Sequence, residues 1–230
     1  ERQGGEVKEH PILFTGEMVR AILDGRKTMT RRVVKSPKGL SAAWGKHMRT
    51  IHDAYAVDGP TIDGTGRFGF LCAGDMGFET LPCPYGVPGD RLWVRETFAC
   101  AEEDGFGVSV RRLFYIADNP GQYLIGGRDW TGNLMAWGVY PSIHMPRWAS
   151  RLTLDVVSVR VERVKDISEA DAIAEGCTLG IDGLTGRLET ARASFARLWD
   201  SINADRGYGW SVNPWVWVVG FMRINAEVTK

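Results

Sequence analysis

The chain has 230 residues, 44% of them hydrophobic and 24% charged, and its 28 basic side chains balance 28 acidic ones. This composition excludes global disorder and is sufficient for a domain with a buried core. A formal net charge of zero excludes a strong overall field, so any attraction to nucleic acid has to come from local clusters of basic residues.

The first predicted elements are a short strand and a short amphipathic helix. Residues 1–10 are polar, and we expect them to form a flexible N-terminus. Residues 11–14 indicate a strand, and Thr15 is a typical N-cap for a helix whose apolar residues recur at helical spacing. Gly25 can end that helix in a left-handed conformation, so residues 26–32 are expected to leave the helix axis as a loop or the start of a strand.

Two polar, glycine-rich stretches interrupt the middle of the chain and are interpreted as insertions. Residues 36–82 show no sustained period and are expected to be mainly loops, with one short strand at 68–72. A tight turn precedes an alternating strand at 91–98. The second insertion covers 101–140 and contains one strand near 113–117.

The last third of the chain carries the strongest periodic signals. Residues 150–164 alternate in two phases, which predicts a long strand with a β-bulge near Val156. A Ser-x-x-Asp pattern at Ser168 begins a short helix, and a further helix is expected over 189–202. Residues 215–221 are apolar on both faces, which is typical of a central strand.

These elements predict a mixed α+β barrel of about five to six strands with short flanking helices, and no linker divides residues 11–224 into two domains. Four cysteines without a CxxC pair favour neither a disulfide framework nor a metal site, so we expect a reduced compartment and no metal. No window approaches the roughly 18 apolar residues of a membrane span, and the polar start lacks the apolar core of a secretion signal. A cytoplasmic protein without a membrane partner is expected.

A basic segment follows Gly25 in a chain that is otherwise neutral. It contains Arg26, Lys27, Arg31 and Arg32. Arginine offers a planar bidentate donor and lysine a point charge, and both suit phosphate. The segment is therefore either a binding site for a nucleotide or nucleic acid, or a solvated basic loop.

Glu175 is expected at the last helical position before Gly176. The negative end of the helix dipole disfavours a carboxylate there by about 0.3 to 1 kcal/mol. A nearby cation such as Lys27 would compensate for this position, although a fully exposed glutamate would also tolerate it.

Three segments carry a family resemblance: residues 25–31 (Gly-Arg-Lys-Thr-Met-Thr-Arg), the turn at 88–94, and the helix at 169–176 ahead of a tryptophan-rich terminal strand. Together they resemble an ASCH domain, a branch of the PUA-like barrels. The block at 141–151 further resembles ASCH-containing proteins that are common in phage and prophage genomes. The resemblance covers most of residues 11–224 and implies a PUA-like barrel from a bacterial or phage-infected cell.

Some small bacterial ASCH proteins are N4-acetylcytidine amidohydrolases that use a lysine, a threonine three residues later and a glutamate on a later helix. Those positions correspond to Lys27, Thr30 and Glu175. The resemblance implies that Thr30 attacks an N4-acyl group of a cytidine-type nucleoside or nucleotide, with Lys27 as its base and no cofactor. Glu175 would orient Lys27 or protonate the leaving amine, and a backbone N–H or Arg26 would stabilise the oxyanion. The simpler interpretation is that Thr28 and Thr30 only pack at a sheet edge.

His144, Arg147 and Trp148, which precede the long strand, form another candidate site. A PUA-like barrel could direct Trp148 to stack on a flipped base, Arg147 to a phosphate and His144 to a base edge. The simpler interpretation is structural, with Trp148 anchored in the barrel mouth and Arg147 on a carboxylate. Two other functions stay open: a non-catalytic module that binds RNA or a modified base in DNA, and a ribonuclease that uses Lys27 and His144 at a 2′-hydroxyl.

Overall fold

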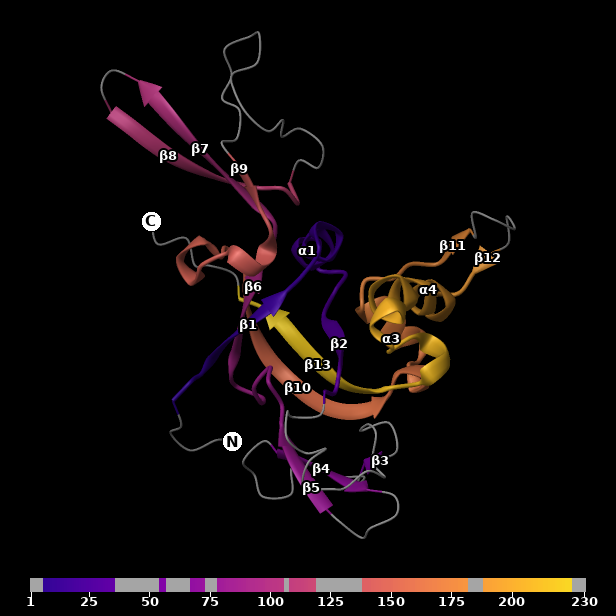
Figure 1. Cartoon of the computed structure of the whole chain (residues 1–230). Helices are drawn as coiled ribbons and strands as arrows, with labels where there is room; N and C mark the ends of the chain where they lie inside the picture. Colours follow the sequence, from indigo (N-terminus) through magenta and orange to yellow (C-terminus); the bar gives the residue numbers. More distant parts are fainter. Residues whose placement is uncertain are drawn as a thin grey trace.

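A strongly curved five-stranded sheet forms the centre of the molecule (Figure 1). The computed structural model describes residues 6–35, 54–56, 67–72, 78–105, 108–118, 138–181 and 188–224. The sheet order is β1-β6-β10-β13-β2, in which β1 runs parallel to β6 and the other pairs are antiparallel. Its strands are β1 (Glu9–Leu13), β2 (Met29–Val33), β6 (Arg91–Arg95), β10 (Thr153–Arg163) and β13 (Trp215–Arg223).

Helices and smaller sheets surround this central sheet. The helices in the described part of the chain are α1 (Gly16–Leu23), α3 (Glu169–Ala174) and α4 (Ala191–Asn203), with 3-10 turns η2 (Ser142–His144), η3 (Arg147–Ala149), η4 (Val164–Asp166), η5 (Ala204–Arg206) and η6 (Trp210–Val212). The smaller sheets contain β3 (Ala54–Ala56), β4 (Arg67–Cys72) and β5 (Phe78–Pro82), then β7 (Phe98–Gly105), β8 (Val108–Tyr115) and β9 (Gly138–Tyr140), and finally β11 (Gly180–Ile181) and β12 (Leu188–Glu189). None of the described helices is both long and apolar enough to cross a membrane.

The mixed α+β class is confirmed, but no closed barrel is found among the described residues. β1 and β2 are the two edges of the central sheet, and no backbone pairing joins them. A side chain bridges them instead: Arg32 on β2 donates from Nη2 to the carbonyl of Leu13, and its guanidinium lies 5.2 Å from the centre of the Phe14 ring. The sheet therefore curves towards closure without completing the hydrogen-bonded ladder of a barrel.

Two predictions about the long strands are confirmed, namely the bulge in β10 and the burial of both faces of β13. The pairing of β10 with β13 shifts register between Val156 and Ser158, where the bulge was expected. β13 is buried on both faces and separates two clusters of core side chains. Trp217 and Val219 pack in the cluster that also contains α1 residues, whereas Val216 and Val218 pack against the α3 and α4 side.

The helix boundaries follow local hydrogen bonding, as predicted. The Thr15 side chain accepts from the Met18 N–H, and the Ser168 side chain accepts from the Asp171 N–H. Gly25 has a φ of 74°, so the chain leaves α1 in the left-handed conformation that favours glycine.

Several strands differ from the predictions. The polar start of the second insertion belongs to β7, which pairs with β8 over Phe98–Gly105, because ladder pairing to a partner strand outweighs local polarity. Within the first insertion β4 is confirmed and is flanked by β3 and β5, which were not expected. β1 begins at Glu9, inside the segment expected to be flexible. Residues 1–5, 36–53, 57–66, 73–77, 106–107, 119–137, 182–187 and 225–230 lie outside the described residues.

Candidate functional site

The loop after α1 and the end of α3 meet although they are 148 positions apart in the chain. Lys27 and Glu175 form an isolated antiparallel β-bridge, and the Thr28 N–H donates to the Ala174 carbonyl at 2.8 Å. Gly176 makes this contact possible: its φ is 90°, and a Cβ there would lie 3.2 Å from the Ala21 Cβ and 3.3 Å from the Lys27 Cβ. Close backbone approach thus fixes the lysine beside the glutamate.

Lys27 and Glu175 form a buried ion pair. The Lys27 Nζ donates to Glu175 Oε2 at 2.6 Å, and to the carbonyl oxygens of Glu175 and Met29, both at 2.8 Å. The two side chains are only 1% and 5% exposed. Burial lowers the pKa of Lys27, and the Glu175 carboxylate opposes that shift. Three acceptors around Nζ require three N–H donors, so the amine has no lone pair to offer in this arrangement. The expected compensation of Glu175 by Lys27 is confirmed.

Arg31 extends this pair into a network of charges behind the site. Its buried guanidinium donates to Glu162 Oε1 from Nε at 2.9 Å and to Asp171 Oδ2 from Nη2 at 2.6 Å. Its Nη1 lies 3.5 Å from Glu175 Oε1. Arg160 also bonds Glu162 and Asp171. Because carboxylates occupy its donors, Arg31 is not the free phosphate-binding group that the sequence suggested.

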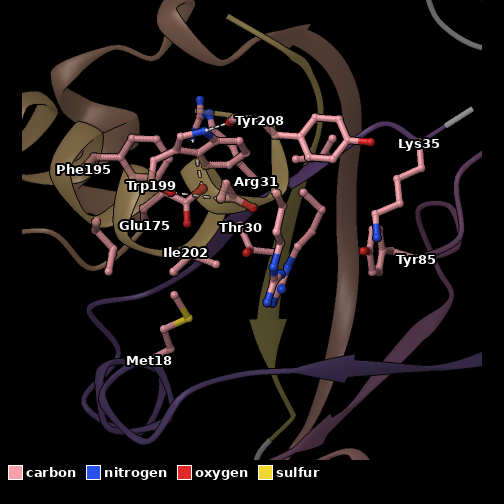
Figure 2. A pocket seen from close by; sticks show the side chains of 15 residues that line it. Met18, Thr30, Arg31, Lys35, Tyr85, Glu175, Phe195, Trp199, Ile202 and Tyr208 are labelled. Atoms are coloured by element: carbon pink, nitrogen blue, oxygen red, sulfur yellow. Dashed lines mark hydrogen bonds and ion pairs between the residues drawn. The ribbon is translucent and has the colours of Figure 1, made fainter. Parts of the chain in front are cut away.

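A pocket of 390 Å³ lies along the free edge of β2, between this strand and α4. This volume is within the usual range of roughly 300 to 1,000 Å³ for small-molecule sites. Figure 2 shows Thr30 and Glu175 on its inner wall, Phe195 and Trp199 on one side, and Tyr85 with Lys35 on the other. Trp199 is held in place because its indole N–H donates to the Tyr208 carbonyl at 2.7 Å. The pocket thus combines aromatic faces with a hydroxyl and a carboxylate.

Thr30 and Arg32 reach the pocket from alternate positions of β2, opposite Val219 and Trp217 of β13. Thr30 is 3% exposed. None of the hydrogen bonds among the described residues joins its hydroxyl to Lys27 or Glu175. Lys27 is not among the residues that line the pocket, so it is linked to this site through Glu175. The structure therefore brings Lys27 and Glu175 into direct contact, and Thr30 and Glu175 into one cavity.

The other predicted site residues lie elsewhere. Arg26 pairs with Asp24 at 2.8 Å and borders a second hollow, of 320 Å³, which is also lined by Glu175. His144 is exposed on η2 and lines neither hollow. The Lys27 donors are all bonded to Met29 and Glu175, so the Lys27–His144 arrangement of the ribonuclease hypothesis has no support in the described geometry.

Arg147 and Trp148 form no part of the pocket. Arg147 donates to both carboxylate oxygens of Glu9, at 2.7 and 2.8 Å, which confirms the structural interpretation of this residue. Trp148 is 78% exposed, so its expected anchoring in a barrel mouth is wrong. The 3-10 turn η3 explains this, because adjacent side chains of the turn point in different directions and Ala149 takes the buried position.

The sequence did not reveal several residues of the site. Phe195 and Trp199 belong to the helix expected over 189–202, but helical spacing cannot show that part of an apolar helix face lines a cavity. Tyr208 and Arg206 follow α4 without any periodic signal. Searches against family models, curated proteins and solved structures find no match.

Proposed function

We propose that this chain is an amidohydrolase that binds a cytidine-type nucleoside or nucleotide in the β2 pocket and removes an acyl group from its exocyclic N4 amine. The observation that carries the proposal is the arrangement of Thr30, Glu175 and Lys27. Thr30 and Glu175 line one cavity, and the Lys27 Nζ, outside the cavity lining, lies 2.6 Å from Glu175 Oε2. These are the three positions to which the ASCH resemblance assigns the reaction. A PUA-like fold is part of the same proposal.

The lining of the pocket supports a nucleobase as the ligand. Trp199 and Phe195 from α4 and Tyr85 from the opposite side place aromatic side chains around the polar inner wall. Aromatic faces stack on any base, whereas a few placed polar groups select one. A base with an acylated amine would present that group to Thr30 and Glu175.

The proton route follows from the contacts of Lys27. Because its amine has no lone pair, we assign the base role to the Glu175 carboxylate, which lines the pocket, and make Lys27 a positioning residue. Glu175 takes the Thr30 proton while the hydroxyl oxygen bonds to the acyl carbon. When the C–N bond breaks, Glu175 returns the proton to the N4 amine. A water then cleaves the acyl–threonine ester, again through Glu175, and the acid is released.

A backbone N–H can stabilise the oxyanion in this scheme. The Thr28 carbonyl accepts from β13 and the Val34 N–H donates to it. In an antiparallel pair every second residue points its backbone N–H and C=O groups at the partner, so the even-numbered residues of β2 direct these groups towards β13. The Arg31 N–H, at an odd position, therefore points to the free edge, directly after Thr30. Such a donor aimed at developing charge is worth about 3 kcal/mol in other acyl-transfer sites.

The test is hydrolysis of N4-acetylcytidine and its 5′-monophosphate by the purified chain and two matched variants. Thr30→Val keeps the side-chain volume without the hydroxyl and should lower kcat/KM by at least about 100-fold. Thr30→Ser keeps the hydroxyl and should retain most of the activity. Full activity in Thr30→Val, or no hydrolysis of either compound by the wild-type chain, rejects the proposal.

One observation favours a second candidate function, a non-catalytic base-binding module. The Thr30 hydroxyl lacks a hydrogen bond to any base among the described residues, so it is not activated in this arrangement. Such a module would bind cytidine compounds without hydrolysing them. Binding of N4-acetylcytidine without any release of acetate therefore separates it from the hydrolase.

A further inference from the structure

The β2 pocket carries more positive charge than its reaction requires. Its lining contains four cationic side chains and one carboxylate. The carboxylate, Glu175, is already matched by Lys27, and Arg31 is matched by Glu162 and Asp171. No described ion pair engages the remaining three cations, which are Arg32, Lys35 and Arg206. In a chain whose formal net charge is zero, these three unmatched cations on one cavity are a local excess that calls for an anion.

Arg32 is the most informative of the three. Its Nε is buried and has no hydrogen-bond partner, while Nη2 donates to the Leu13 carbonyl. The Phe14 ring and the Leu13 carbonyl hold the guanidinium in one orientation. Burial lowers the pKa of Arg32, and Tyr85 and the Glu175 carboxylate, with which Arg32 forms no ion pair, only oppose that shift. A guanidinium held in this way without a carboxylate partner can offer its remaining terminal N–H groups to a phosphate.

Three neighbouring side chains complete the arrangement around Arg32. Lys35 is exposed at the pocket rim, and Figure 2 shows it beside Tyr85. Tyr85 is close enough to interact with Arg32, and burial raises the pKa of its phenol, so the hydroxyl keeps its proton and can donate. Arg206 adds a third cation from η5.

We infer that Arg32 and Lys35, assisted by Tyr85 and Arg206, form a phosphate subsite, so that the ligand of this pocket is a nucleotide and not a free nucleoside. This inference rests on the proposed function for the identity of the base, but the subsite itself depends only on the unmatched cations. The phosphate would displace no protein carboxylate, because none is paired with Arg32 among the described residues.

Calorimetric titration with cytidine, cytidine 5′-monophosphate and cytidine 3′-monophosphate tests the subsite. At least one monophosphate should bind about 10-fold or more tightly than cytidine, as charge-assisted hydrogen bonds predict. The variant Lys35→Gln/Arg206→Gln changes two exposed side chains and should lose most of that advantage while its affinity for cytidine is kept. The control Lys8→Gln/Arg91→Gln removes the same charge near the opposite edge of the sheet and should behave as wild type.

Binding of inorganic phosphate, followed by its ³¹P line width, separates this inference from the proposed function. Phosphate that binds wild type more tightly than the double variant supports the subsite, even if no cytidine compound binds and the hydrolase proposal fails. Equal affinity for cytidine and both monophosphates overturns the subsite while leaving the hydrolase intact. A tetracytidylate that binds much more tightly than either monophosphate, with a steeper salt dependence, overturns the mononucleotide assignment in favour of a polymer.

Discussion

Replacing Lys27 by methionine removes the ammonium group but keeps an unbranched stem of similar length, which makes it the most direct test of the buried pair. The change leaves the Glu175 carboxylate, 5% exposed, without its partner at 2.6 Å, and leaves the Met29 and Glu175 carbonyls without their Nζ donor. Breaking a buried ion pair from one side costs about 3–5 kcal/mol. Arg31 stays 3.5 Å from Glu175, and the pocket admits water, so we expect the lower end of that range, about 3 kcal/mol.

Urea unfolding monitored by tryptophan fluorescence measures this loss. In a chain of this size about 3 kcal/mol corresponds to a fall in Tm of roughly 6–12 °C. The double variant Lys27→Met/Glu175→Gln removes the unpaired charge and should recover part of the loss. Arg91→Met breaks an exposed pair with Asp155 and should cost less than about 1 kcal/mol. If Lys27→Met costs no more than Arg91→Met, the pair does not hold the two segments together.

Two further predictions concern the same junction. Burial lowers the pKa of Lys27 below its ordinary value of 10.5, and protonated Lys27 positions Glu175. We therefore expect kcat/KM to fall as pH rises through the lowered pKa. A rise of kcat/KM over that range would show that neutral Lys27 is the base. Gly176→Ala places a Cβ against Ala21 and Lys27 at a φ of 90°, so it should cost more than the roughly 1–2 kcal/mol of backbone strain alone and lower activity. Gly89→Ala, at a φ of 94° with open space around it, measures the strain alone in the same unfolding assay.

Local signals predicted the local structure well. The helix caps at Thr15 and Ser168, the left-handed Gly25 and the bulge after Val156 each follow from a few neighbouring residues, so the sequence contains their causes. The contact of Lys27 with Glu175 was anticipated from the unfavourable position of a carboxylate at a helix end. The charge network around this contact was not anticipated, because the partners of Arg31 come from β10 and α3, more than 130 positions away in the chain.

Arg31 and Arg32 show why a charge run cannot be interpreted from its composition. The two are adjacent, and both were expected to bind phosphate, yet a strand directs consecutive side chains to opposite faces. Arg31 therefore enters the carboxylate network, whereas Arg32 lies over Phe14 with one donor unpaired. Both arginines line the pocket, and the register of β2 against β13 decides which of them pairs with acids.

The same register explains why the site lies at an edge strand. β2 pairs with β13 on one side only, and α4 covers the other side with side chains instead of a further strand. Backbone donors of β2 are thus left for a ligand next to Thr30, while the opposite face of the strand packs in the core beneath α3 and α4. A slip of one residue would bring Arg31 to the position of Thr30 and bury Arg32 among carboxylates. The Lys27–Glu175 bridge, formed immediately before the strand begins, opposes that slip, so the ion pair that positions the carboxylate also keeps the hydroxyl on the pocket side.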